Sequence, residues 1–370
     1  MIITKILSPF FFLAMRILSV IVYAVTILAA FGGSINPDYL TFPSLLCLAL
    51  PYFAIFTIVL IAFWAITRKI IFCAMGIVTI ILCLTPLSTA FPIATPRSPE
   101  GEGQTFKIIS WNVLHTRDLR QPDYPGNRAL EYLIASDADI VCLAEVRTFS
   151  DTELPNLSEG LRDSLFSAYP YRAGLESTDL KVLSKYPVKR IDRISFNEFN
   201  FARFDFFLVN FPHDRELVVG MAHLYSYGLS EEERQVVTEI NSMESAKSSM
   251  AEFKGSIRDK LRNAFRQRAI DAKILREHLD DISLDIPLVV CGDFNDVPVS
   301  WTYNMVKGDD MKDAYAETNF GPAVTYNLHA FYFHIDQMLY RGPLRALDVR
   351  VGKINSSDHY PLIGEFQFLE

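Results

Sequence analysis

The first 91 residues carry almost no charge, and this limits what the chain can fold into more than any other feature. The charged side chains of this segment are Lys5, Arg16, Asp38, Arg68 and Lys69. The uncharged apolar stretches are Ile17–Gly33, Tyr39–Ile66 and Ile70–Pro96. Each stretch supplies most or all of the roughly 20 residues that a helix needs to cross a bilayer. The pattern therefore predicts a three-helix transmembrane anchor over residues 1–91.

The first apolar stretch alone has a second interpretation, a cleaved signal peptide, but this does not explain the other two. The positions of the cations predict the orientation, because short loops rich in Lys and Arg tend to stay in the cytoplasm. Arg68 and Lys69 fill the turn before the third stretch and Lys5 precedes the first, whereas the opposite loop carries only Asp38. We expect a multi-pass protein of the cell membrane with the rest of the chain on the non-cytoplasmic side.

Beyond the anchor the composition becomes that of a water-soluble, acidic domain. Pro92, Pro96 and Pro99 follow one another closely, which is typical of a linker, and we assign the linker to residues 92–105 and the domain to 106–370. Without the anchor the chain keeps 31 basic and 42 acidic side chains, a formal charge of −11. Such a charge argues against binding to nucleic acid by charge alone, although it leaves room for a local basic groove. The cysteines indicate neither a disulfide framework nor a zinc site.

Strand-like and helix-like patterns alternate in the domain, as in α/β proteins. The strand candidates are Phe106–Val113, Ala138–Val146, Phe204–Phe211, Glu216–Leu224, Pro287–Cys291, His334–Tyr340 and Pro361–Phe368. Helical patterns cover Asn127–Ser136 and much of a long polar region, Ser230–Asp281.

The long polar region contains two parallel stripes at helical spacing. The apolar stripe is Ile257, Leu261 and Phe265, and the basic stripe is Arg258, Arg262 and Arg266. The cautious interpretation is a surface helix with one apolar face and one solvated basic face. The alternative is that the three arginines bind an anionic substrate.

Several predicted strands end in polar side chains, which would be unfavourable there unless they bound a ligand. The clearest case is IPLVVCGDFNDV at 286–297, an apolar run that stops at Asp293 and Asn295. The other polar residues at strand ends are Asn112, Glu145, His223, Asp336, Asp358 and His359. Carboxylates, amides and imidazoles without a thiolate cluster favour Mg²⁺, or Mn²⁺, over zinc. The set indicates metal-assisted phosphoester hydrolysis.

The ordered series WN, E, H, GDFN, D and SDH resembles the endonuclease/exonuclease/phosphatase (DNase I-like) family from about Phe106 to Phe368. The stretch VLSKYPV, at 182–188, is similar to a strand and turn that is frequent in this family. The resemblance implies a four-layered α/β sandwich, two packed mixed sheets flanked by helices, with the site at one end of the sheets. Two positions depart from the family: Ala144 stands where Gln is frequent, and Ala222 where Thr is frequent. Neither position is a metal ligand in the family, so the departures concern substrate contacts.

The resemblance also implies which residues hold the metal. Glu145 would be the principal Mg²⁺ ligand, with Asn112 beside it and Asp358 contributing to the shell of the ion. Each has a structural alternative: Asn112 could cap a turn, and Asp358 could belong to an ordinary loop. Only the joint order of the motifs favours the functional role.

The same resemblance implies catalytic roles for five residues. Asp293 would align or deprotonate the attacking water, and Asn295 would hold a phosphate oxygen. His359, oriented by Asp336, would stabilise charge on the phosphoryl group, and His223 would do the same or assist the leaving oxygen. Taken singly, His223 could be a core imidazole and Asp336 could pair with an arginine.

The family does not select a substrate, because its fold serves nucleic acids, phospholipids and small phosphate esters alike. The predicted anchor, the non-cytoplasmic side and the acidic domain favour a lipid headgroup or small phosphate ester over chromosomal DNA. An extracytoplasmic nuclease is the alternative, and the arginine stripe could serve either substrate. A non-catalytic binding module is a third hypothesis, disfavoured because no expected site residue is lost. We infer no obligate protein partner.

Overall fold

The computed structural model of the protein describes residues 9–146, 158–174, 179–194, 202–228, 247–328 and 331–369. Lys5, which contributes to the predicted orientation, lies outside these residues, as do residues 230–246 of the long polar region. The remainder of that region forms one helix, α10 (Lys247–Asp280).

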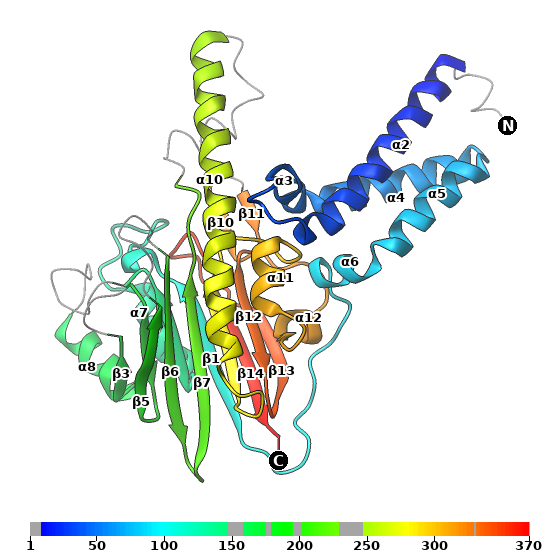
Figure 1. The fold of residues 1–370 in the computed structure, drawn as a ribbon. Helices are drawn as coiled ribbons and strands as arrows, with labels where there is room; N and C mark the ends of the chain where they lie inside the picture. Colours follow the sequence, from blue (N-terminus) through cyan, green and yellow to red (C-terminus); the bar gives the residue numbers. More distant parts are fainter. Residues whose placement is uncertain are drawn as a thin grey trace.

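Two six-stranded sheets form the centre of the domain (Figure 1). The first has the order β13-β14-β1-β2-β4-β3, with β1 (Thr105–Asn112), β2 (Ile140–Ala144), β3 (Tyr171–Ala173), β4 (Lys181–Ser184), β13 (Leu344–Val351) and β14 (Leu362–Phe368). The second has the order β5-β6-β7-β8-β12-β9, with β5 (Val188–Ile194), β6 (Arg203–Phe211), β7 (Arg215–His223), β8 (Leu288–Asp293), β9 (Lys312–Asp313) and β12 (Asp336–Arg341). Both sheets are mixed, because β1 pairs in parallel with β2 and β7 with β8, whereas the other pairs are antiparallel.

Helices cover the outer face of each sheet, and the inner faces pack on each other. Strand β8 shows how its sequence fits this layering: Val289 and Cys291 face the core between the sheets, whereas Leu288 and Val290 face the second core, under α10 and α11 (Trp301–Lys307). A strand buried on both faces must be apolar at every position, hence the unbroken run that precedes Asp293. The first sheet packs in the same way against α7 (Arg128–Ser136) and α8 (Glu159–Ala168). A mixed α/β fold with two sheets flanked by helices is thereby confirmed.

All seven predicted strands overlap observed ones, but the prediction omits several edge and hairpin strands. Two of the omitted strands, β5 and β13, contain a register shift, between Arg190 and Asp192 and between Ala346 and Asp348. An extra residue in a strand breaks the alternation of apolar and polar side chains by which strands are detected. The short hairpin of β10 (Tyr326–Leu328) and β11 (Phe331–Phe333) gives too few residues for a pattern.

The N-terminal helices differ from the three continuous spans that the apolar stretches predict. In the described residues, α2 (Pro9–Phe31) and the turn after it form the one uninterrupted segment long and apolar enough to cross a bilayer. The second stretch is bent by 70° between α3 (Phe42–Leu48) and α4 (Leu50–Ile66), and the third by 64° between α5 (Ile70–Leu82) and α6 (Leu84–Ala90). Pro51 and Pro86 lie just after the two bends, and proline disrupts a helix because it lacks an N–H and clashes with the preceding turn. Each bent pair reaches spanning length only as a unit.

The N-terminal helices contact the α/β domain directly. Gly33, in the short helix η1 (Gly32–Ser34), lies so close to Val299 that a Cβ atom would come within 1.8 Å of the Val299 carbonyl oxygen. The Asn304 amide donates to the Gly33 carbonyl at 3.4 Å, and the Arg266 guanidinium donates to the Asp38 carbonyl at 3.2 Å. These contacts place η1 and the loop that leads to α3 beside the domain.

The predicted linker is hydrogen-bonded along the edge of the domain. The backbone N–H of Ala94 donates to Asn319 at 2.9 Å, and that of Arg97 donates to Leu347 at 2.7 Å. The segment between α6 and β1 therefore has a defined path.

Candidate active site

The polar residues at the strand ends meet because of the sheet topology. Asn112 ends β1 and pairs with Ala144, the last residue of β2, so Glu145 follows at the same edge. His223 ends β7 and pairs with Asp293, which ends the parallel strand β8. Strand β12 is antiparallel to β8, so its first residue, Asp336, also pairs with Asp293. Strand direction alone thus brings these side chains to one edge.

The loop before β14 brings Asp358 and His359 to the same edge. The Ser357 hydroxyl lies 2.9 Å from the Asn112 carbonyl oxygen and accepts a hydrogen bond from the His359 backbone N–H at 3.2 Å. The Trp111 indole donates to the His359 carbonyl at 2.9 Å. The loop is therefore fixed to the end of β1.

The Asn112 amide joins two carboxylates of the site. Its Nδ2 donates to Glu145 Oε1 at 2.8 Å and to Asp293 Oδ2 at 3.2 Å, while its Oδ1 accepts from the backbone N–H of Leu114 at 3.2 Å. Glu145 has a left-handed backbone, with φ of 58°, a conformation that is strained for residues other than glycine and that is concentrated at functional sites.

His359 lies between two buried carboxylates. Its Nδ1 is 2.8 Å from Asp336 Oδ2, and its Nε2 is 3.5 Å from Asp293 Oδ2. Burial alone would lower the pKa of His359, but the negative charges of Asp336 and Asp293 outweigh it and raise this pKa to about 10. Burial raises the pKa of Asp336 to about 6, against the opposing effect of the His359 charge. At neutral pH the pair is therefore an imidazolium and a carboxylate.

Asn295 and His223 complete the polar end of the site. Asn295 also has a left-handed backbone, with φ of 51°; its N–H donates to Asp293 Oδ1 at 2.8 Å, and its Nδ2 donates to the Leu224 carbonyl at 3.0 Å. His223 Nε2 lies 3.7 Å from Glu145 Oε1. His223 Nδ1 is buried and has no hydrogen-bond partner among the described residues.

The donor set of this edge suits a hard divalent cation. Glu145, Asp293 and Asp358 line one cavity, and three carboxylates so placed repel one another unless a cation or an imidazolium lies between them. Their oxygens and the amide oxygen of Asn112 are the ligand types that Mg²⁺ prefers. Asp293, Asp336 and His359 also offer ligand atoms within 4.8 Å of one another. In that group the His359 imidazolium already supplies the positive charge, so the cation fits better beside Glu145.

Supporting residues that the sequence analysis missed hold this edge in place. Thr325 Oγ1 accepts the backbone N–H of Asp336 at 3.0 Å. Asp296 follows Asn295 directly; it is buried, accepts from Thr302 at 2.8 Å and pairs with the fully buried Arg268 at 3.4 Å. The sequence does contain a signal for two of these residues: Asp296 directly follows the GDFN motif, and Arg268 continues the apolar stripe of α10. For Thr325 the sequence offers no signal.

The two stripes of α10 point in different directions. Ile257 and Leu261 line the cavity, and Phe265 is buried. Arg258 and Arg262 are exposed, and Arg266 contacts the Asp38 carbonyl, so none of these arginines lines the cavity. The apolar face of the helix, and not the basic one, faces the site.

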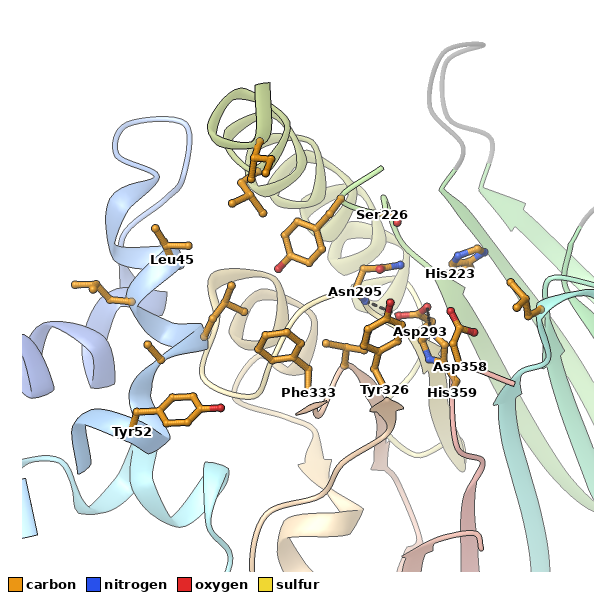
Figure 2. A pocket seen from close by; sticks show the side chains of 18 of the residues that line it. Leu45, Tyr52, His223, Ser226, Asp293, Asn295, Tyr326, Phe333, Asp358 and His359 are labelled. Carbon is orange, nitrogen blue, oxygen red and sulfur yellow. Dashed lines mark hydrogen bonds and ion pairs between the residues drawn. The ribbon is translucent and has the colours of Figure 1, made fainter. Parts of the chain in front are cut away.

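The cavity has a volume of about 720 Å³ and two unlike ends (Figure 2). At the polar end lie Glu145, His223, Asp293, Asn295, Asp358 and His359. The apolar part of the lining includes Leu45, Leu48, Ala49, Tyr52, Ile257, Leu261 and Ile335. Figure 2 shows Phe333 and Tyr326 between Tyr52 and the polar end.

Comparison with family profiles identifies one family. A sequence profile of the Endonuclease/Exonuclease/phosphatase family matches residues 109–359. No curated protein matches the sequence. Among solved structures, an endonuclease/exonuclease/phosphatase from Beutenbergia cavernae is similar at 18% identity, with 72% of each chain covered and a TM-score of 0.47. Truncated Caenorhabditis elegans TDP2 is similar at 17% identity, covering 71% of this chain and 98% of that one, with a TM-score of 0.45. The human Nocturnin catalytic domain is also similar at 17%, with 71% and 94% covered and a TM-score of 0.46.

Proposed function

The chain belongs to the endonuclease/exonuclease/phosphatase family, and from this premise we propose that it is a membrane-anchored, Mg²⁺-dependent phosphoesterase. The substrate would be a phosphodiester or phosphomonoester, with a lipid headgroup or a small phosphate ester favoured. The observation that carries the proposal is the meeting of Asn112, Glu145, Asp293 and the His359–Asp336 pair at one edge of the sheets.

In this proposal, Glu145, Asn112 and Asp358 hold Mg²⁺, with Mn²⁺ as an alternative. When bound, the ion supplies polarisation of the phosphoryl oxygens and neutralises their charge. The Asn112 amide holds the Glu145 and Asp293 carboxylates in fixed positions relative to each other. The left-handed backbone at Glu145 directs this side chain to the edge of the sheet.

The remaining residues bind the phosphoryl group and move one proton. Asp293 accepts a proton from the attacking water, and His359 Nε2 lies 3.5 Å from its carboxylate. His359 then binds a phosphoryl oxygen, with Asp336 fixing the orientation of its ring. Asn295 binds a second oxygen, and His223, which lines the same cavity, stabilises the phosphoryl group or assists the leaving oxygen.

Removal of divalent metal is expected to abolish turnover by the full-length protein in nanodiscs. Chelation with EDTA should lower hydrolysis of bis(4-nitrophenyl) phosphate and 4-nitrophenyl phosphate by about 100-fold or more, and Mg²⁺ should restore it. Mg²⁺ should also raise the Tm, because an ion bound only to the folded state stabilises it. Glu145→Gln should lose most of this rise, whereas Glu216→Gln, an exposed carboxylate on β7, should keep it. Turnover that survives EDTA, or an equal Tm rise in both variants, would count against the proposal.

A nuclease is the second candidate, because the Tyr326 ring packs 5.0 Å from the His359 ring and could stack on a base. Plasmid DNA and RNA belong in the same substrate panel. Metal-dependent cleavage of either polymer at a rate above that of the small esters would favour the nuclease.

We further propose that residues 1–91 form a three-span anchor, 92–105 the linker and 106–370 the hydrolase domain, on the non-cytoplasmic side. The length of the bent helix pairs and the position of Arg68 and Lys69 between α4 and α5 support this. In a bacterial host, alkaline phosphatase fused after Glu370 should be active, and the same reporter fused after Lys69 should be inactive. The opposite pair of results would refute the orientation, and activity in both fusions would refute the number of spans.

A further inference from the structure

The cavity is larger and less polar than a phosphoryl group requires. Its volume of about 720 Å³ lies within the range of roughly 300–1,000 Å³ that is typical of pockets for whole small molecules. All the charged side chains of its lining lie at the end where Glu145, Asp293, Asp358 and His359 meet. Apart from His223, Asn295 and Ser226, the remainder is apolar or aromatic, so most of the space serves a part of the ligand that is neither charged nor strongly polar.

The N-terminal helices form one wall of the apolar half. Leu45 on α3, Ala49 at the bend and Tyr52 on α4 face the cavity, and Figure 2 shows Leu45 and Tyr52 on the side opposite His223 and His359. Leu45 is 42% exposed and Tyr52 is 59% exposed, so these side chains line open space instead of filling a core. The same helices carry further exposed apolar residues, such as Ile55 and Phe56, which suit contact with lipid.

Helix α10 forms a second wall with Ile257 and Leu261. Arg258 and Arg262, on the same helix, are exposed and lie outside the lining. Among the described residues that line the cavity there is no lysine or arginine. A nucleic acid strand brings several phosphates, which need cationic contacts along their path, so the cavity suits a ligand with one phosphate and an uncharged remainder.

We propose that the substrate is an amphiphilic phosphoester with a hydrocarbon chain that lies between the α3–α4 bend and α10 while its phosphate lies at the polar end. The chain would pass from the apolar surface of the N-terminal helices into the cavity without crossing water. This inference rests on the proposed phosphoesterase function. It assigns a substrate-binding role to residues of the anchor.

The test uses the full-length protein in nanodiscs and 4-nitrophenyl esters of methyl, butyl and octyl phosphate, which differ only in chain length. Each methylene that enters the apolar half should raise kcat/KM, by at most about fourfold. Part of this gain is offset because the longer esters partition into the bilayer. We therefore expect kcat/KM to rise about tenfold or more from the methyl to the octyl ester. The 4-nitrophenyl ester of thymidine 5′-phosphate should be turned over no faster than the methyl ester.

Two variants test whether the cavity itself binds the chain. Leu45→Trp and Leu261→Trp narrow the apolar half from two different helices, α3 and α10. Each should lower the octyl rate about tenfold while changing the methyl rate by less than about twofold. Ile55→Trp is the matched control: Ile55 is 55% exposed on α4 and lies outside the lining, so its octyl rate should match that of the wild type. Circular dichroism and the methyl rate report on folding.

The outcomes separate this inference from the function on which it rests. No metal-dependent turnover of any ester would reject the phosphoesterase itself. Turnover of the methyl ester with a flat chain-length series would reject the chain site alone. A rise that persists in both tryptophan variants would do the same, because the gain then does not come from the apolar half of the cavity. Faster turnover of the thymidine ester would assign the cavity to a nucleoside.

Discussion

Asp293→Asn is expected to lower kcat/KM about 10³-fold, the largest single effect in the site, because it removes the group that accepts the proton of the attacking water. The carboxylate is 2% exposed and is placed by three neighbours: the Asn295 N–H at 2.8 Å, the Asn112 amide at 3.2 Å and His359 Nε2 at 3.5 Å. An amide has the same shape but no affinity for a proton near neutral pH. The measurement is steady-state hydrolysis of bis(4-nitrophenyl) phosphate with saturating Mg²⁺.

A folding defect must be separated from a catalytic one, because the new amide would present N–H groups to neighbours that are themselves donors. Asp285→Asn is the control: it makes the same chemical change at an exposed position just before the same strand and should leave the rate unchanged. The Tm of both variants reports on folding. If Asp293→Asn retained more than about a tenth of the activity with an unchanged Tm, Asp293 would not be the base, and another group would have to accept the proton.

The sequence predicts which side chains meet at this edge because they stand at strand ends. Parallel strands that are buried on both faces must be apolar throughout, so Asp293 and Glu145 stand out as abrupt stops in apolar runs. Whether such stops converge depends on strand order and direction, which no local pattern contains. The order of motifs along a known family supplied that information for Asp336 and His359.

Other features could not be read from the sequence, because they depend on contacts between distant segments. The role of Thr325 follows only from its position beside the Asp336 N–H. The direction of the two stripes on α10 depends on how the helix is rotated on the second sheet, and that rotation is set by buried residues such as Phe265 and Arg268. The contribution of Leu45 to the cavity requires the bend between α3 and α4. The apolar composition does not reveal this bend, although Pro51 indicates a break in the helix.

Asp336→Asn is expected to lower kcat/KM at neutral pH by about 100-fold or more and to change the pH profile, because Asp336 acts through His359. In the wild type the charges of Asp336 and Asp293 overcome burial and hold the pKa of His359 near 10, so the imidazolium persists through neutral pH and is lost only as the pH approaches that value. Without the Asp336 charge, burial still lowers this pKa and one of the two main opposing contributions is gone. The pKa of His359 must therefore fall, and the alkaline limb of the activity must move to lower pH.

The pH profile separates this role from a structural one. If binding of the phosphoryl group needs the imidazolium, the Asp336→Asn variant should regain part of its activity as the pH is lowered below neutral, where the wild type gains nothing from added protons. Asp313→Asn is the control, a buried carboxylate on the neighbouring strand β9 that is hydrogen-bonded to the Tyr303 hydroxyl at 2.8 Å and is absent from the cavity lining. It should affect the Tm more than the shape of the profile. If Asp336→Asn lost the same factor of activity at every pH, Asp336 would only support the fold. The activity would then give no evidence that His359 must be positively charged.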